Sequence, residues 1–167
     1  MLANYKVSLK SAEDDRQIIE NLFRYYVYDL AGIIKWPCGD DGSYTFKSSL
    51  LDPHWCRNDH WPYLIYLGDE LAGFCLVRRY PHAPERYDID QFFILRKFKG
   101  MGVGRDAFRL AVSSRPGSWQ VRVLLENIPA LKFWRSVIGD LTLGNFKEGI
   151  LPDNDLDMVF LTFEAAQ

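Results

Sequence analysis

The feature that most constrains the fold of this chain is a glycine-rich turn near its middle. Three glycines alternate with other residues in Gly100-Met101-Gly102-Val103-Gly104, after an apolar segment typical of a strand and before a segment, 106–112, typical of a helix. Glycine lacks a Cβ, so an anion can approach the backbone N–H groups, and the following helix adds unpaired N–H groups and its positive dipole end. The turn therefore predicts a pyrophosphate site, and with it a phosphorylated cofactor.

Basic residues gather around this turn, although the formal net charge of the whole chain is only −2. Lys and Arg far outnumber Asp and Glu within residues 96–135. We expect Lys97, Lys99 and Arg105, which flank the glycines, to contact the anion, whereas more distant basic residues suit a solvated helix face. A net charge this close to zero argues against a nucleic acid as the partner.

Length and composition predict a single domain over residues 1–167. The chain has 167 residues, of which 48% are apolar, which is enough to build one sizeable core. No stretch approaches the roughly 20 apolar residues of a membrane span, and residues 1–6 lack the apolar core of a signal peptide. Cys38, Cys56 and Cys75 are widely spaced and suit free thiols. We therefore expect a cytoplasmic protein without a membrane partner.

Hydrophobic periodicity and turn signals predict a chain that alternates strands with helices. We expect strands at 5–9, 62–67, 71–80, 87–95, 119–125, 141–146 and 156–163, and helices at 12–31, 103–114 and 130–137. Residues 32–60 are irregular in pattern, with a short helix near 46–51. The strands on either side of the 103–114 helix form a βαβ unit and should be parallel, while the other strands read as an antiparallel meander.

A second motif follows the 119–125 strand. Asn127, Ala130, the pair Phe133-Trp134 and Gly139 lie on and after the start of the next helix. Taken together and in this order, the glycine turn and this second motif resemble those of the GCN5-related N-acetyltransferase (GNAT) superfamily. The cofactor signature of that family begins with Arg or Gln, where this chain has Lys99. The resemblance implies a single-domain α/β (α+β) fold, whose mixed, mostly antiparallel twisted sheet has a central splayed parallel strand pair flanked by helices.

The resemblance implies acetyl-CoA as cofactor and transfer of the acetyl group to a primary amine of a small molecule or protein, by direct attack on the thioester. The backbone around the glycine turn would bind the pyrophosphate, and the exposed edge of the 87–95 strand would hydrogen-bond the pantetheine amides. A backbone N–H of Phe93 or Ile94 would polarise the thioester carbonyl. The implied cofactor-binding residues are Phe93, Ile94, Leu95, Lys99, Gly100, Met101, Gly102, Val103, Gly104, Arg105, Asn127 and Trp134.

Trp134 departs from the pattern of many family members. Related enzymes often have a tyrosine at the second position of the aromatic pair, where its hydroxyl can protonate the leaving thiolate of CoA. An indole N–H donates hydrogen bonds but does not act as a practical acid. We therefore expect Trp134 to pack beside the cofactor, while solvent or another side chain supplies the proton.

Two carboxylates are candidates for the base that removes a proton from the attacking amine. Strand alternation predicts that Asp90 shares a face with Phe92 and Ile94, and burial beside Phe92 would raise the pKa of Asp90. Glu126, next to Asn127, is the second candidate. Each of these carboxylates is equally consistent with a solvated acid at the end of a strand.

The acceptor site is expected between the first helix and the 32–60 segment, where aromatic faces and acids suit a cationic amine. Its candidate residues are Tyr25, Tyr26, Tyr28, Trp36, Tyr44, Trp55, Trp61, Asp29, Asp40 and Asp41, many of which core packing explains equally well. His54, Cys56 and His60 with the distant Cys38 form a weak zinc pattern, because no paired-cysteine spacing is present. No metal is therefore expected.

Two alternatives to catalysis by a GNAT enzyme stay open. Gly102-x-Gly104-x-x-Ala107 fits a dinucleotide fingerprint, but that motif should directly follow its strand and belong to a doubly wound sheet. The other alternative is a non-catalytic GNAT-fold module that binds CoA as a sensor or binds only a partner. The sequence does not identify the amine acceptor, and it leaves a homodimer open.

Overall fold

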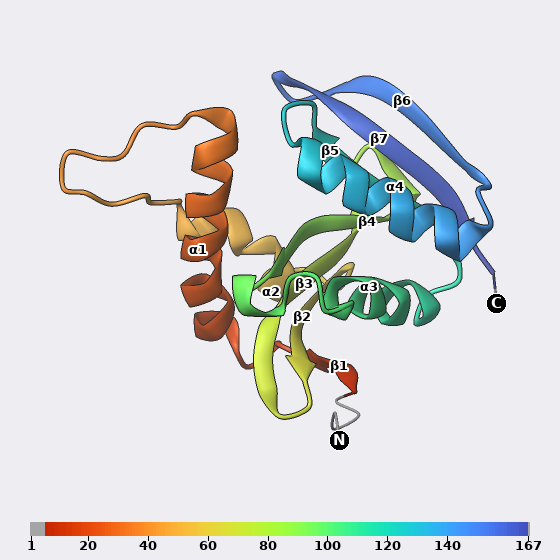
Figure 1. Ribbon diagram of the computed structural model, residues 1–167, viewed down its shortest axis with the longest axis horizontal. Helices are drawn as coiled ribbons and strands as arrows, with labels where there is room; N and C mark the ends of the chain where they lie inside the picture. Colours follow the sequence, from red (N-terminus) through yellow and green to blue (C-terminus); the bar gives the residue numbers. More distant parts are fainter. Residues whose placement is uncertain (1–5, 167) are drawn as a thin grey trace.

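The computed structural model describes residues 6–166 of the chain. Its strands are β1 (Val7–Ser11), β2 (His60–Leu67), β3 (Glu70–Tyr80), β4 (Ala83–Ile94), β5 (Gly117–Leu124), β6 (Phe146–Asp153) and β7 (Leu156–Ala165). Its helices are α1 (Arg16–Ile34), α2 (Pro53–Cys56), α3 (Val103–Ser113) and α4 (Ile128–Thr142), with short 3-10 turns at Ser48–Leu51 and Arg96–Phe98. Figure 1 shows their arrangement.

The strands form one seven-stranded mixed sheet in the order β1-β2-β3-β4-β5-β7-β6. Every neighbouring pair is antiparallel except β4 and β5, which are parallel, so the predicted fold class is confirmed. The parallel pairing covers only Tyr87–Ile89 of β4 against Trp119–Val121 of β5, whereas β5 stays paired with β7 as far as Leu124. Beyond Ile89 the two central strands therefore splay apart and leave an edge of β4 unpaired.

The two faces of the sheet carry separate cores. On one face, α3 and α4 pack through residues such as Phe108 and Trp134 against the centre of the sheet. On the other face, α1 packs through Ile19, Phe23 and their neighbours against β2, β3 and Phe93 of β4. Figure 1 shows α1 on one side of β4, and α3 and α4 on the other side. The splayed part of β4 thus lies between three helices.

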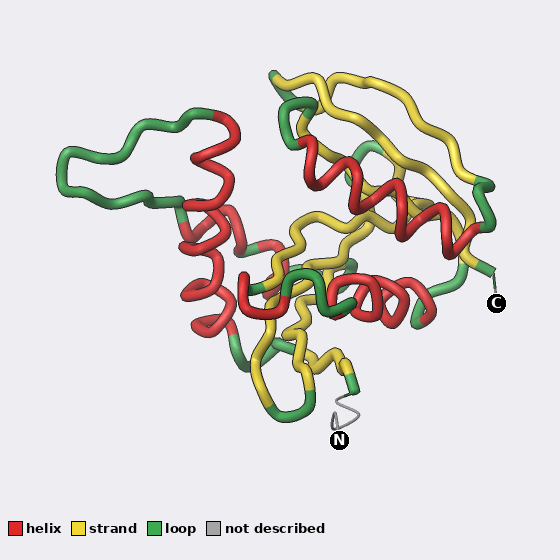
Figure 2. The backbone as a smooth tube through the Cα atoms, in the orientation of Figure 1, coloured by secondary structure: helices red, strands yellow, loops and turns green. Residues whose placement is uncertain are grey.

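The first helix begins and ends later than its sequence pattern suggests. The helix was expected to begin at residue 12, but Ser11 just before it belongs to β1, where it pairs with Tyr63, and α1 begins only at Arg16. The helix passes through Gly32 and ends at Lys35, which adopts the left-handed conformation at φ 60°. Residues 35–47 then form a loop that projects from the end of α1 (Figures 1 and 2). The predicted start of the first strand at Tyr5 lies outside the described residues.

The predicted strand at 141–146 is wrong. Helix α4 does not stop at Gly139 but continues to Thr142, and the next strand, β6, begins only at Phe146. The helix ends where Leu143 takes φ 53° and Gly144 takes φ 82°. A left-handed residue at a helix end is the usual stop signal, so the helix ends here and not near Gly139, just after the predicted end at residue 137.

Within the described residues, no helix is long and apolar enough to cross a membrane.

Candidate functional site

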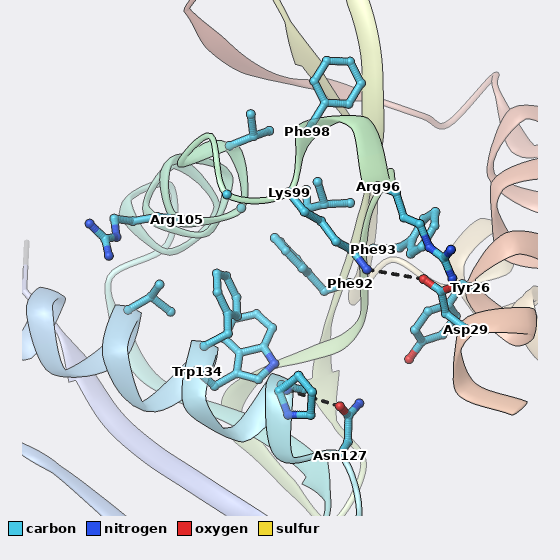
Figure 3. A pocket seen from close by; sticks show the side chains of 18 of the residues that line it. Tyr26, Asp29, Phe92, Phe93, Arg96, Phe98, Lys99, Arg105, Asn127 and Trp134 are labelled. Atoms are coloured by element: carbon cyan, nitrogen blue, oxygen red, sulfur yellow. Dashed lines mark hydrogen bonds and ion pairs between the residues drawn. The ribbon is translucent and has the colours of Figure 1, made fainter. Parts of the chain in front are cut away.

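The unpaired edge of β4 borders a cavity of about 760 Å³ between α1, α4 and the start of α3 (Figure 3). All the cofactor-binding candidates line this cavity except Leu95 and Met101. Leu95 is half-buried and packs between the two cores, and Met101 is 60% exposed at the tip of the glycine turn. The cavity therefore brings together both sequence motifs, although they lie on different elements.

The glycine turn has the geometry of an anion site. Gly100 and Gly102 adopt φ values of 79° and 81°, which favour glycine, and they lead directly into α3 at Val103. Among residues 6–166, the backbone N–H groups of Gly102, Val103, Gly104 and Arg105 have no hydrogen-bond partner. A Cβ on Gly104 would lie 3.1 Å from the ring of Phe133, so glycine at this position lets α3 approach α4 closely. Four unpaired N–H groups at a helix N-terminus are suited to bind phosphate oxygens.

Cations at the mouth of this cavity are paired with a carboxylate of α1. Asp29 accepts hydrogen bonds from Arg96 at 2.9 Å and from Lys99 at 3.4 Å, and all three residues line the cavity (Figure 3). Arg105 also lines it and pairs with Asp140 at 3.6 Å. Lys97 is not among the lining residues and pairs with Glu70 instead, so its predicted anion contact gains no support. Arg96 was missed as a separate candidate, although it begins the basic run.

The backbone of β4 identifies the N–H that faces the cavity. Leu95 donates its N–H to the carbonyl oxygen of Ala72 at 2.8 Å, toward β3. Successive N–H groups of a strand point to opposite sides, so that of Phe93 also faces β3 and that of Ile94 faces the gap beside β5. Of the two predicted donors, Ile94 is therefore the one that the geometry favours.

Asp90 lies at a β-bulge, which overturns the predicted face. In the pairing of β3 with β4, Leu76 lies opposite Gln91 and Val77 lies opposite Ile89, so Asp90 is the extra residue. Phe92 and Ile94 pack into the core beneath α3 and α4, whereas Asp90 lies with Asp88 on the other face, where Arg78 and Arg122 contact both carboxylates. A bulge interrupts the alternation of side chains, so counting residues along the strand gives the wrong face.

The Asp90 carboxylate is held by two guanidinium groups and an imidazole. Oδ1 accepts a hydrogen bond from Arg122 at 3.0 Å and forms an ion pair with Arg78 at 3.0 Å, and Oδ2 accepts a hydrogen bond from Nε2 of His54 at 2.9 Å. Burial alone would raise the pKa of Asp90, but the hydrogen bond from His54 and the charges of Arg78 and Arg122 outweigh it and lower the pKa to about 2. The expectation of a raised pKa was therefore wrong, because it ignored these partners.

A second cavity of about 270 Å³ occupies the gap between the splayed strands, and Asp90 and Arg122 line it. Tyr26, Trp134 and Asn127 line both cavities, so the two adjoin. Asn127 caps α4, because its side-chain oxygen accepts the N–H of Ala130 at 3.2 Å, which leaves its amide N–H groups free for other partners. Glu126 is exposed and lines neither cavity, so the structure does not bring the two candidate bases together.

Trp134 is buried among aromatic side chains at the edge of both cavities. Its side chain is only 6% exposed and lies edge-on to Phe92 and Phe108, with ring centroids 5.1 and 5.4 Å away. Across the cavity, Figure 3 shows the Tyr26 side chain reaching from α1 toward Trp134 and Asn127. Burial raises the pKa of the Tyr26 hydroxyl, and the negative charge of Asp90 is a second, smaller cause of the same shift.

Few of the predicted acceptor-site aromatics reach the cavities. Tyr26 and Asp29 do, whereas the indole of Trp55 donates to the Ala12 carbonyl and Trp61 packs on Tyr87. Within residues 6–166, no group of His, Cys, Asp or Glu is arranged to hold a metal ion. The sequence reading missed His54, Arg78, Arg122, Leu156 and Met158 as neighbours of the site. In the sequence, only the two histidines of the weak zinc pattern indicated that the 32–60 segment contributes residues near the site.

Comparison with known proteins gives the family. The model of the Acetyltransferase (GNAT) family matches residues 27–139, which include both motifs and most residues lining the two cavities. The chain belongs to this family. It is therefore an acyltransferase of a family that uses acetyl-CoA. The dinucleotide alternative fails, because the sheet is mostly antiparallel and not doubly wound.

Solved structures of acetyltransferases share the fold across almost the whole chain. An acetyltransferase from Thermus thermophilus superposes with a TM-score of 0.68 at 15% identity, covering 96% of this chain and 98% of that one. A spermidine N-acetyltransferase from Vibrio cholerae, solved with CoA and spermine, gives 0.64 at 15% identity, with 95% of each chain covered. The ribosomal-protein-S18-alanine N-acetyltransferase of Escherichia coli gives 0.66 at 11% identity, covering 97% and 96%. No curated protein matches the sequence.

Proposed function

We propose that this acyltransferase binds acetyl-CoA in the large cavity and transfers the acetyl group to a primary amine that enters through the second cavity. The main observation that supports the proposal is that the two cavities adjoin and form one continuous site. An anion-binding turn, an unpaired strand edge and the largely buried carboxylate of Asp90 follow one another along the start of α3 and β4. This order matches that of the phosphate and the pantetheine amides of acetyl-CoA, followed by the amine that would attack its thioester.

The chain offers a partner for each part of acetyl-CoA. The free N–H groups of residues 102–105 would bind the pyrophosphate, with Lys99 and Arg105 adding charge. The unpaired edge of β4 would hydrogen-bond the pantetheine arm as an added strand does. The N–H of Ile94 would donate to the thioester carbonyl and stabilise the negative charge that develops there during attack. Trp134 would pack against the arm without exchanging a proton.

Asp90 is proposed as the anion that receives the acceptor amine. Its pKa of about 2 makes it a weak base, so it would orient the ammonium group while the proton leaves through water. Among the described residues, His54 is the one partner of Oδ2, which leaves an acceptor position on that oxygen. Glu126 has no comparable support, because it is exposed and lines neither cavity.

Cationic amines are the substrate class that this site favours. Asp90 and Asp29 both line the cavities, and Tyr26 adds an aromatic face between them. The similar structure from Vibrio cholerae is that of a spermidine acetyltransferase, and the one from Escherichia coli is that of a ribosomal-protein-S18-alanine acetyltransferase. Both a small polyamine and a protein amine are consistent with the proposed reaction.

The decisive experiment is a CoA-release assay with a thiol reagent. Purified protein receives acetyl-CoA and, in parallel, n-butylamine, spermidine, amino acids, aminoglycosides or peptides with a free N-terminus. Release of CoA that depends on one amine, with the acetylated amine identified by mass spectrometry, supports the proposal. Binding of CoA without release for any amine would instead favour a CoA-binding sensor. No binding of CoA at all would refute the assignment of the large cavity.

A further inference from the structure

A buried histidine lies against the proposed amine-binding carboxylate. His54 comes from α2, in the segment before β2, and its side chain is 2% exposed. Its Nε2 lies 2.9 Å from Oδ2 of Asp90, and Nδ1 is buried without a partner. The ring also packs edge-on against His60, with centroids 4.8 Å apart. Asp90 is thus the one hydrogen-bond partner of His54 among residues 6–166.

The contact fixes which nitrogen of His54 carries a hydrogen. An ionised carboxylate only accepts hydrogen bonds, so Nε2 must donate to Asp90. A hydrogen on Nδ1 would be buried without an acceptor, which costs free energy, so Nδ1 is best left as a bare lone pair. The imidazole therefore adopts the Nε2–H form.

The other two partners of Asp90 also form ion pairs with other carboxylates. Arg78 and Arg122 both also bind Asp88, and Arg122 binds Asp153 as well, so these two guanidinium groups hold β3, β4, β5 and β6 together. Both guanidinium groups contact Oδ1 of Asp90, whereas His54 alone contacts Oδ2, which keeps an acceptor position. A carboxylate held at both oxygens cannot rotate about its χ2 torsion.

We propose that His54 is a positioning residue, whose Nε2–H holds Oδ2 of Asp90 at the second cavity so that its remaining lone pair meets the acceptor amine. This inference rests on the proposed function, but it concerns a residue that lines neither cavity. It also assigns a role to His54, which the sequence analysis singled out only as part of a weak zinc pattern. Its specific consequence is that losing His54 impairs use of the amine and not binding of the cofactor.

Kinetics of three variants test this consequence, with n-butylamine as the probe amine. His54→Leu removes the donor, and we expect kcat/KM for the amine to fall about 10- to 100-fold, the range for loss of one charge-assisted hydrogen bond. The KM of acetyl-CoA should change less than about twofold. His54→Gln restores a side-chain N–H and should recover part of the loss. His60→Leu is the matched control, because His60 is buried beside His54 but hydrogen-bonds Asp59 instead of Asp90.

Two kinetic results would overturn the inference. One is an amine kcat/KM in His54→Leu equal to that of the wild type. The other is an equal loss in His60→Leu, which would assign the effect to general packing. A variant that fails to bind CoA is excluded from the comparison, and the next measurement then decides.

The tautomer of His54 provides a test on the unaltered protein. Nitrogen-15 NMR of the imidazole side chains should show a hydrogen on Nε2 and a bare Nδ1, and addition of CoA should not change this. The resonance is assigned with His54→Gln. A hydrogen on Nδ1 with a bare Nε2 would refute the contact. Failure of every amine in the CoA-release assay would count against the proposed function, while the tautomer would still decide the role of His54 at Asp90.

Discussion

Replacing Asp29 by Asn should tighten the binding of CoA. In the structure Asp29 engages Arg96 and Lys99, two cations that line the cofactor cavity. A phosphate group that recruits either cation has to displace the Asp29 carboxylate first. The amide of Asn keeps the shape of the side chain but removes the competing charge, so the cations become free to bind the cofactor.

The geometry sets the size of the effect. The two pairs measure 2.9 and 3.4 Å, but the Arg96 and Lys99 side chains are 76% and 55% exposed. Exposed ion pairs contribute about 0.2 to 1 kcal/mol each. Loss of both should therefore tighten the Kd of CoA by about 2- to 30-fold. Because exposed charges are screened by salt, the difference between variant and wild type should shrink as ionic strength rises.

Titration calorimetry of CoA at about 50 and about 500 mM salt, where the Debye length differs about threefold, measures this. Glu70→Gln is the matched control: it also removes one acid paired to the same basic run, but its partner Lys97 does not line the cavity. The control should leave the Kd unchanged. An unchanged or weaker affinity in Asp29→Asn would refute the argument, as would equal tightening in Glu70→Gln.

Three further predictions follow from the same site. Gly102→Asp should abolish CoA binding in calorimetry, because the carboxylate repels phosphate. The φ of 81° should cost the Asp about 1 to 2 kcal/mol of stability, but its Cβ meets no atom within 4 Å, so the protein should stay folded. Trp134→Phe should retain most of kcat at saturating acetyl-CoA, and a loss beyond roughly a hundredfold would indicate a proton-transfer role. The pKa of Asp90 is lowered from 3.8 to about 2, so its contribution to stability is present above pH 3.8 and lost as pH falls toward 2. The urea midpoint of unfolding should therefore drop across this pH window in the wild type, and it should drop less in Asp90→Asn.

The local structure around the proposed cofactor site could be predicted because its signals are local. The glycine turn, the helix from Val103 and the cap at Asn127 each depend on neighbours within a few residues, and the structure has all three. The same locality explains the error at the end of α4. Gly139 and Gly144 are both acceptable helix stops in the sequence, and only the packing of the whole helix selects the second.

The acceptor half could not be predicted because its contacts are distant in sequence. Asp90 meets His54 across 36 residues and Arg122 across 32 residues, and no periodicity reports such pairs. The bulge at Asp90 arises from the pairing of β4 with β3 and leaves no mark in the β4 sequence itself. Two predictions about Asp90 were therefore wrong, because they were argued from the β4 sequence alone: the face of the sheet on which Asp90 lies, and the direction of its pKa shift.

The absence of a tyrosine at position 134 need not cost the enzyme much. A thiol has an ordinary pKa near 8.5, so a thiolate that leaves unprotonated at pH 7 is about 1.5 pKa units, or about 2 kcal/mol, above its neutral form. Tyr26 lines both cavities, but burial raises the pKa of its hydroxyl, so in the proposed complex it would donate a hydrogen bond without surrendering the proton. Solvent can then protonate the thiolate after it has left. In the proposed mechanism, the step that the protein must assist is therefore attack on the carbonyl, and the Ile94 N–H and the Asp90 carboxylate held by His54 would assist it.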